Sequence, residues 1–372
     1  MPRNEAGRYR HIEVQPVAGA LGAEIRGVNV AAALDDAVIA EIRQAYLDHL
    51  VIFFRDQKLT PHEQLAFAKR FGEPMEYPQL KGLPECPLIT PVVKLAHEQV
   101  NFGGVWHSDT TYLAQPPMAS MLYAVEIPPY GGDTIFANQY MAYDTLSDGL
   151  RGALDGLVGV NTSTKAEASK TREDRLRATG AEMKVLTSEH PVARTHPETG
   201  RKALYVNHGH TARFKGWTEE ESAPLLDYLF QHQVRLELTC RFQWQPGSIA
   251  FWDNRCVQHN AVNDYAGFKR LMHRVTLAGD TPRCGPPLAN LGSGLALRHF
   301  RVRGDSSRPE NVVMQDLTPS YLPDQRGLRF STKALAPSMR SSVVRRRVAR
   351  SFSRRMPSSS GSPSPATTAS FA

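Results

Sequence analysis

Two kinds of hydrophobic pattern alternate in the first part of the chain. Ile12–Val17 and Leu50–Phe54 are short and strand-like, and the second is apolar enough to be buried on both faces. Between them, Asp36–Leu47 carries apolar residues at helical spacing. Residues 60–63 (Thr-Pro-His-Glu) predict a helix start, with a threonine N-cap, a proline in the first turn and a glutamate that closes a capping box. The apolar stripe that follows, up to Gly72, is assigned to the hydrophobic core.

From about Trp106 the pattern becomes mainly β. Short segments rich in aromatic and β-branched residues are separated by turn signals, and they are Ala119–Glu126, Thr134–Ala137, Ala203–Asn207, Thr239–Trp244, Ser248–Trp252 and Met272–Ala278. Two segments with helical spacing interrupt them, Gln139–Leu157 and Thr218–Gln233. This order predicts a mainly β fold with α-helices. We expect a double-stranded β-helix, the cupin-like jelly roll, with flanking helices and one end open as a pocket.

Composition is that of a globular protein, but the charge is unevenly placed. The 372 residues are 41% hydrophobic and 22% charged, with a net charge of +7. From Arg326 onward there are ten Lys/Arg and no Asp or Glu, so the preceding part is mildly acidic. We therefore expect no nucleic-acid partner for the body of the protein. The prediction is one globular domain over 1–329 and a disordered basic Ser/Pro/Arg-rich tail over 330–372.

Other features bear on location and mobility. The polar segment Met1–Val14 lacks the apolar run of a secretory signal, and no stretch reaches the roughly 20 apolar residues of a membrane span. Four scattered cysteines without a CxxC pattern favour free thiols, so a cytoplasmic location without membrane contact is predicted. Thr162–Glu182 is charged and weakly apolar, which fits either a solvated surface insert or a lid over the pocket.

The candidate chemistry begins at His107 and Asp109. On an extended strand, two residues that far apart point to the same face. His259 lies far downstream, and Arg270 follows it on a further predicted strand. Two histidines and a carboxylate form the facial ligand set of non-haem Fe(II) oxygenases, which leaves half of the octahedron open. Because a chain with 13 histidines can contain a His-x-Asp pair by chance, the pair alone is weak and the other residues carry the prediction.

Beyond these residues, the chain from about His11 to Pro282 resembles the Fe(II)/2-oxoglutarate-dependent dioxygenases of the taurine dioxygenase (TauD/TfdA) family. The matching pieces are Trp106-His107-Ser108-Asp109, Gly131-Gly132-Asp133-Thr134, His196-Pro197-Glu198-Thr199-Gly200-Arg201, Trp252-Asp253-Asn254-Arg255 with His259, and Arg270-Leu271-Met272-His273-Arg274. Together they are highly specific.

The resemblance implies roles for these residues. His107, Asp109 and His259 match the iron ligands and so carry the catalysis, while Arg270 and Thr134 match the residues that bind the distal carboxylate of 2-oxoglutarate. An arginine can hold a carboxylate through two parallel hydrogen bonds. The implied cofactors are Fe(II), 2-oxoglutarate as co-substrate and O₂, with succinate and CO₂ as products. Retention of the carboxylate argues for hydroxylation, since halogenating relatives give it up to chloride.

The implied substrate is a small organic anion. Arg274 matches the arginine that holds the sulfonate in taurine dioxygenase, and it lies on the same predicted strand as Arg270. Taurine itself is disfavoured, because Gly103 replaces the polar group that would recognise the amine and His210 replaces a phenylalanine. Tyr112 is a further candidate for lining the pocket. We expect a sulfonate, an alkyl sulfate, or an aryloxy or other carboxylate.

Two other classes of function stay open at this stage. A metal-dependent hydrolase could use the same three ligands to activate water, and it would need no O₂. A binding protein could act through the basic tail, on nucleic acid or an anionic surface, with an inactive barrel. Family members commonly form dimers or tetramers, so a homo-oligomer is implied by resemblance only.

Overall fold

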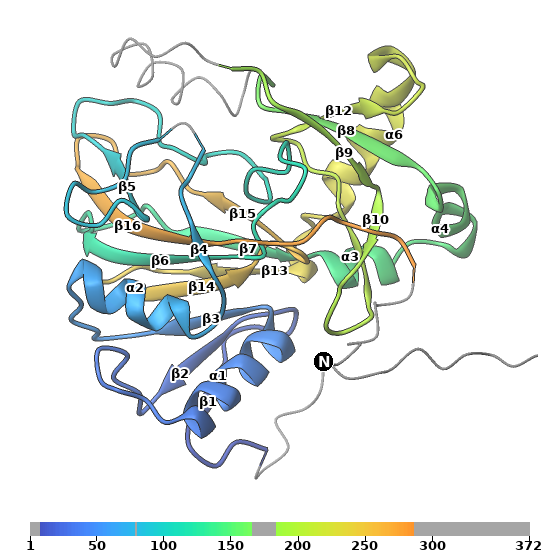
Figure 1. Ribbon diagram of the computed structural model, residues 1–372. Coiled ribbons are helices and arrows are strands. Elements are labelled where there is room, and N and C mark those ends of the chain that lie inside the picture. The colour runs from blue at the N-terminus through green and yellow to red at the C-terminus, as the bar shows by residue number, and fades with distance from the viewer. Residues whose placement is uncertain (1–7, 79, 166–183, 286–372) are drawn as a thin grey trace, which may run out of the picture. The chain divides into compact units, whose positions relative to one another are not determined.

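Two β-sheets form the centre of the protein (Figure 1). The computed structural model describes residues 8–78, 80–165 and 184–285. The larger sheet has eight strands, in the order β1 (Glu13–Pro16), β2 (Ala23–Arg26), β3 (Val51–Phe54), β14 (Ile249–Asp253), β6 (Ala119–Glu126), β16 (Arg270–Leu277) and β4 (Pro74–Met75), with β5 (Ile89–Lys94) also paired to β16. The smaller sheet has the order β13 (Thr239–Phe242), β7 (Thr134–Asn138) and β15 (Val257–Ala261).

The strand β3 shows how the core is built on both faces of the larger sheet. Val51 and Phe53 pack into the core between the two sheets, where the rings of Phe53 and Phe242 stack at 4.0 Å. Ile52 and Phe54 point the other way, because side chains alternate along a strand, and they pack under the helices. All four residues of β3 are buried, as its apolar sequence predicted.

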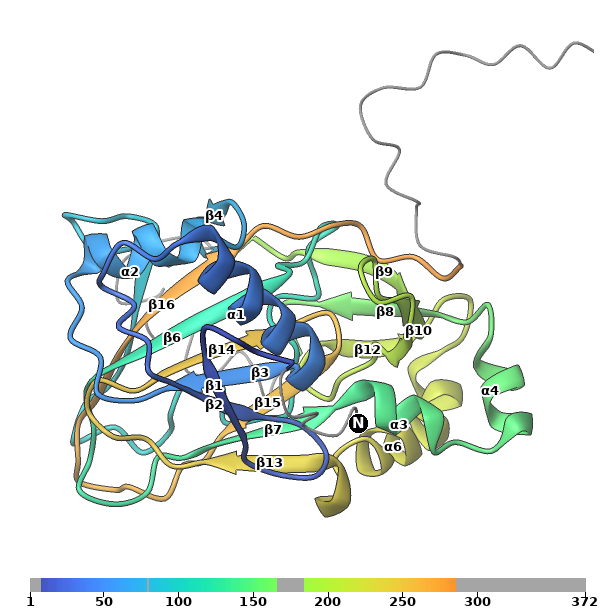
Figure 2. The same cartoon turned by 90° about the horizontal axis from the view of Figure 1, so that it is seen from below.

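Helices α1 (Asp36–His49) and α2 (Pro61–Lys69) cover the outer face of the larger sheet, as the two ribbon views show (Figure 1 and Figure 2). The predicted capping box of α2 is present: the Thr60 hydroxyl accepts from the Glu63 N–H, and the Glu63 carboxylate accepts from the Thr60 N–H. Leu50 was expected to begin the strand. It instead ends α1 in the left-handed conformation (φ 68°), with its N–H on the Tyr46 carbonyl.

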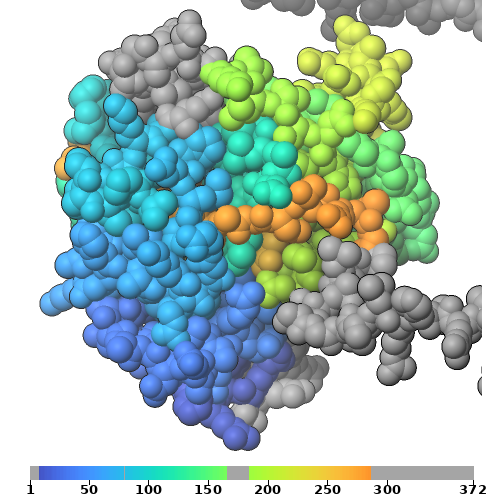
Figure 3. Space-filling model, in the orientation of Figure 1, coloured from blue at the N-terminus to red at the C-terminus, as the bar shows by residue number. Residues whose placement is uncertain are grey.

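A second group of elements lies beyond the open end of the smaller sheet. It comprises the sheet β12 (Thr211–Phe214), β8 (Val158–Thr162) and β9 (Thr187–Pro191), the pair β10 (Ala193–Thr195) and β11 (Lys202–Leu204), the helices α3 (Gln139–Asp144), α4 (Asp148–Leu154) and α6 (Glu219–His232), and the short 3-10 helix η1 (Leu236–Leu238). The helices of this group, together with β11, β12 and η1, form a third hydrophobic core. In the space-filling view the blue N-terminal residues and the green residues of this group occupy different sides of the molecule (Figure 3).

The observed architecture is the predicted mainly β jelly roll with flanking helices, but besides the placement of Leu50 three further local predictions were wrong. The single helix expected over Gln139–Leu157 is two helices, because Ser147 caps the second by accepting from the Leu150 N–H. The strand expected over Ala203–Asn207 is only Lys202–Leu204. The segment His107–Asp109 is not a strand, since only His107 makes a β-bridge and a turn follows, with φ 43° at residue 110.

Several predictions concern residues outside the described ranges. Most of the proposed lid, Thr162–Glu182, and the boundary between 1–329 and 330–372 lie there, so these stay predictions. Within the described ranges the four cysteines are unpaired thiols, three of them buried. Among the same residues, no helix is long and apolar enough to cross a membrane.

Candidate metal and co-substrate site

Two segments far apart in the sequence place His107 beside His259. They exchange both hydrogen bonds of an isolated antiparallel bridge: the His107 N–H donates to the His259 carbonyl (3.1 Å), and the His259 N–H donates to the His107 carbonyl (2.8 Å). Directly opposed residues of such a pair point to one face. The two imidazoles consequently lie side by side, with ring centroids 4.2 Å apart.

Asp109 completes a three-sided donor set. Its Oδ1 lies 3.7 Å from His107 Nε2 and 4.0 Å from His259 Nε2, and its side chain is almost fully buried. One carboxylate oxygen and two imidazole nitrogens therefore converge within 4.8 Å of one another. This is the donor set of Fe(II) oxygenase sites with open coordination positions. On their chemistry and proximity, the three residues fit a divalent iron.

Hydrogen bonding sets the tautomer of His107, and burial favours the neutral form of His259. His107 Nδ1 lies 2.7 Å from the Val105 carbonyl oxygen, which can only accept, so Nδ1 carries the proton and Nε2 presents its lone pair. Burial, helped by the neighbouring His107, lowers the pKa of His259 to about 3. A neutral imidazole at neutral pH can ligate without first losing a proton.

The Asp109 carboxylate is oriented by a small polar network. Ser120 Oγ on β6 donates to Asp109 Oδ2 at 2.6 Å and accepts from Asn254 Nδ2 at 3.0 Å. Asn254 Oδ1 in turn accepts from Trp252 Nε1 at 2.8 Å. Burial alone would raise the pKa of Asp109, but the charge of Arg274 holds that pKa well below its usual range. Sequence reasoning missed Ser120, because a serine inside a strand carries no motif.

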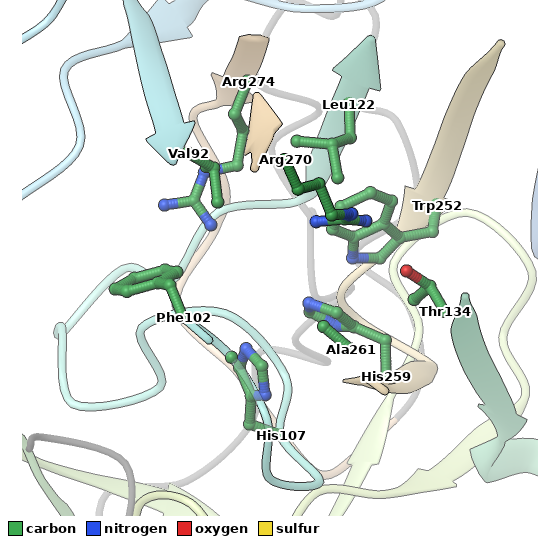
Figure 4. A pocket seen from close by; sticks show the side chains of 11 residues that line it. Val92, Phe102, His107, Leu122, Thr134, Trp252, His259, Ala261, Arg270 and Arg274 are labelled. Atoms are coloured by element: carbon green, nitrogen blue, oxygen red, sulfur yellow. The ribbon is translucent and has the colours of Figure 1, made fainter. Parts of the chain in front are cut away.

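A pocket opens beside the imidazoles, and side chains from both sheets converge on it (Figure 4). Its lining is Val92, Phe102, Gly103, His107, Leu122, Thr134, Trp252, His259, Ala261, Arg270 and Arg274. The pocket thus gathers residues of β5, β6, β7, β14, β15 and β16 next to the candidate metal ligands.

Arg270 is a buried cation without a hydrogen-bonding acid among the described residues. Its side chain is 4% exposed, and Nε and Nη2 have no hydrogen-bond partner. Burial lowers the pKa of Arg270. Beside it, Trp244 Nε1 donates to Thr134 Oγ1 at 3.0 Å, which leaves the hydroxyl proton of Thr134 available to an acceptor. An unpaired buried cation is costly unless an anion joins it, so these residues fit the distal carboxylate of 2-oxoglutarate.

Arg274 links the metal ligands to the rest of the pocket. Its Nη1 donates to Asp109 Oδ1 at 3.3 Å, while its buried Nε and Nη2 have no hydrogen-bond partner. The guanidinium lies 3.8 Å from the Tyr77 ring centroid and 5.5 Å from that of Phe102. Tyr77, which follows the short strand β4, is therefore the aromatic side chain that packs against this guanidinium.

The other three predicted substrate residues fall into two groups. Gly103 lines the pocket with φ 80°, and a Cβ there would lie 3.3 Å from His107 Cε1. His210 and Tyr112 are buried outside the lining: the His210 ring stands edge-on to His107 at 5.9 Å and to Tyr112 at 5.0 Å. His210 thus packs against the ring of a candidate iron ligand and Tyr112 packs against His210, and a direct substrate contact for them stays a prediction.

A second buried cluster contains His196, Asp253 and Cys256, but its donors are already occupied. His196 Nδ1 accepts two backbone N–H groups, so Nε2 donates to Asp253 at 3.0 Å. Arg255 binds both oxygens of Asp253, at 2.8 and 2.7 Å, and also reaches Glu198 at 2.7 Å. Burial raises the pKa of Cys256 well above its usual range, so the thiol stays protonated. This network ties the turn between β14 and β15 in place, which positions the strand carrying the second histidine ligand.

Comparison with known proteins agrees with this geometry. Residues 13–276 match the model of the family described as taurine catabolism dioxygenase TauD, TfdA family. The chain belongs to this family. It is 40% identical over 277 residues to an alpha-ketoglutarate-dependent sulfate ester dioxygenase of Pseudomonas putida, covering 73% of this chain and 91% of that one. It is 35% identical to an alkylsulfatase of Acinetobacter baylyi, covering 73% and 86%.

Solved structures give the same result for the fold. The crystal structure of a taurine dioxygenase from Burkholderia xenovorans is 38% identical, superimposes with a TM-score of 0.63, and covers 73% of this chain and 91% of that chain. The predicted family, jelly-roll fold and enzyme class are therefore confirmed: the protein is a 2-oxoglutarate-dependent dioxygenase of the TauD/TfdA family. Its cofactor set is that of the family, Fe(II), 2-oxoglutarate and O₂, and the His-Asp-His donor set matches it.

Proposed function

We propose that the protein oxidises alkyl sulfate esters at the carbon that bears the ester oxygen. The observation that carries this proposal is Arg274, a buried guanidinium beside the candidate iron ligands with two nitrogens free of hydrogen bonds. The sulfate ester dioxygenase and alkylsulfatase named above support this substrate class. The cytoplasmic location and the oligomeric state are not needed for the proposal and stay predictions.

The proposed reaction divides the pocket between two anions. His107, Asp109 and His259 hold Fe(II), which together with 2-oxoglutarate and O₂ supplies the oxidant that inserts oxygen into a C–H bond. Arg270 and the Thr134 hydroxyl hold the distal carboxylate of the co-substrate, because both offer donors that lack an acceptor. Arg274 binds the sulfate group and so positions the adjacent carbon next to the metal ligands.

The proposed reaction converts the sulfate ester into an aldehyde and inorganic sulfate. One oxygen atom of O₂ enters the C–H bond beside the ester oxygen, and the other enters the new carboxylate of succinate, with release of CO₂. The resulting 1-hydroxyalkyl sulfate loses its hydroxyl proton and forms the carbonyl of an aldehyde, while the bond between its carbon and the ester oxygen breaks. Inorganic sulfate departs with the electron pair of that bond. The products are an aldehyde, sulfate, succinate and CO₂.

An alkyl sulfate fits the lining better than taurine does. Taurine carries an ammonium group, and the described lining has no acidic side chain to receive it. Instead, Val92, Phe102 and Leu122 offer apolar surface to an alkyl chain, and Gly103 adds no side chain. The three terminal oxygens and the single negative charge of a sulfate ester match those of a sulfonate, so the arginine serves either.

The test is a panel of alkyl sulfates, alkyl sulfonates and aryloxy acids, screened by substrate-dependent succinate release. We expect the highest kcat/KM with an alkyl sulfate, together with equal amounts of sulfate, aldehyde and succinate. A higher kcat/KM for a sulfonate or an aryloxy acid would contradict the proposed substrate. Arg274→Leu should raise the KM for the sulfate ester and leave the KM for 2-oxoglutarate nearly unchanged, and an equal rise in both would show that the two arginine roles are confused.

Two controls separate the other functions. A hydrolase with the same ligands would release sulfate without O₂ and would form an alcohol, whereas the oxidation requires O₂ and forms an aldehyde. His107→Ala, Asp109→Ala and His259→Ala should each abolish succinate formation. A variant that lacks residues 330–372 should keep its turnover, and loss of function on that deletion would favour a role for the tail.

A further inference from the structure

Lys94 is a buried lysine directly opposite Arg270. In the antiparallel pair of β5 with β16, Lys94 and Arg270 are facing partners, so both side chains point to the same side of the larger sheet. On β5, Val92 lies two residues before Lys94 and lines the pocket, which shows that this is the inner side. The Lys94 side chain is 2% exposed.

The Lys94 ammonium has no acidic partner among the described residues. Its Nζ is buried and makes no hydrogen bond, and it lies 4.6 Å from the centroid of the Tyr265 ring. The Tyr265 ring also lies beside Arg270, because a Cβ on Gly132 would touch both, at 3.2 and 3.4 Å. Lys94 and Arg270 therefore both lie next to the Tyr265 ring, on the side of the sheet that faces the pocket.

The nearby carboxylates are engaged elsewhere. Asp133 and Asp264 both bind Arg241, at 2.6 and 3.5 Å, and Glu126 binds Lys269 at 2.6 Å. Like charges facing each other across a strand pair destabilise the sheet, and burial without a counter-charge adds to the cost. The carboxylate of a bound ligand, placed between the two cations, would relieve both costs.

We propose that Lys94 is a second cationic contact for the distal carboxylate of 2-oxoglutarate, opposite Arg270. The inference rests on the co-substrate role given to Arg270 under the proposed function. Lys94 then makes the enzyme selective for 2-oxo acids with a second carboxylate. Its role is confined to the co-substrate end of the pocket, since Arg274 and the sulfate group lie further along β16.

Binding to the Mn(II)-loaded protein, measured by calorimetry, tests the proposal. The probes are 2-oxoglutarate and 2-oxopentanoate, which has the same chain length without the distal carboxylate. Lys94→Met should weaken 2-oxoglutarate binding about 10- to 100-fold, as expected for losing one partner of a desolvated charge pair. Binding of 2-oxopentanoate should change less than about 3-fold, because it makes no contact with the ammonium. Lys94→Arg should retain most of the affinity, and Lys58→Met is the matched control at an exposed lysine.

Thermal unfolding separates this role from a structural one. Without 2-oxoglutarate, Lys94→Met should raise the Tm, because it removes an unpaired buried charge, and 2-oxoglutarate should then add less stabilisation than it adds to the wild type. A variant that is less stable or fails to fold would mean that Lys94 serves packing against Tyr265, and this would overturn the proposal. Equal loss of both ligands, or unchanged 2-oxoglutarate binding, would overturn it too. Failure of the wild type to bind 2-oxoglutarate would instead refute the proposed function.

Discussion

Replacing Ser120 with alanine tests whether the polar network around Asp109 prepares the metal site. The hydroxyl bridges Asp109 Oδ2 at 2.6 Å and Asn254 Nδ2 at 3.0 Å, and Ser120 is fully buried. Loss of the bond to the carboxylate costs about 1.5–3 kcal/mol, and the amide left without an acceptor costs about 1–3 kcal/mol. Partial relaxation offsets some of this, so we expect Ser120→Ala to lower the free energy of unfolding by about 2–5 kcal/mol.

The same change should weaken metal binding, because a carboxylate that has lost its orienting donor must be ordered by the metal. Removal of such supporting hydrogen bonds typically lowers metal affinity about 10- to 100-fold, which corresponds to about 1.4–2.7 kcal/mol. Mn(II) binding followed by calorimetry measures this, below the Tm of the variant. The keto-acid end of 2-oxoglutarate needs the metal, so its affinity should fall as well.

Ser248→Ala is the matched control. Ser248 is equally buried, and its hydroxyl accepts from Arg55 Nη1 at 2.9 Å and from the Gln245 N–H at 3.1 Å, away from the metal ligands. It should lower stability while leaving Mn(II) affinity unchanged. If Ser120→Ala loses stability but binds Mn(II) within about 3-fold of the wild type, the network is only structural and the reasoning about Asp109 is refuted.

Three further predictions follow from buried contacts. Gly103→Ala should cost about 1–2 kcal/mol of stability through its positive φ, and should weaken Mn(II) binding because the new methyl presses on a ligand ring; unchanged metal affinity would contradict this. Arg255→Met should lower the free energy of unfolding by about 3–5 kcal/mol in chemical denaturation, since Asp253 would stay buried without its main counter-charge. A loss below about 1 kcal/mol would show that this ion pair contributes little to stability. Burial lowers the pKa of His190 and His196, so as the pH falls these histidines take up protons in the unfolded chain before they do so in the folded protein. The Tm should therefore fall as the pH drops below about 6.5, the ordinary pKa of histidine. A Tm that rises between about pH 7 and pH 5 would contradict this pH dependence.

Short sequence patterns predicted the helix starts and strand ends that depend on interactions between neighbouring residues. The capping box predicted at Thr60 is present, because it joins groups within one turn, and the structure shows the same Thr-x-x-Glu arrangement at Thr218. The strand β6 has the predicted ends, Ala119–Glu126. The short strands β8 and β12 were missed, because their apolar residues are few and their pairing partner lies about fifty residues away.

The sequence by itself determined which side chains could hold iron and 2-oxoglutarate, because a ligand set depends on residue types and a family pattern preserves them in order. Tertiary structure decided how they meet. His107 faces His259 through a bridge across 150 residues, not along a strand with Asp109. The turn after His107 brought the Asp109 carboxylate to Ser120 on β6, and strand register set Lys94 opposite Arg270. Such neighbours are set by pairing between distant strands, where a shift of one residue would turn each side chain to the opposite face, and no local pattern encodes that choice.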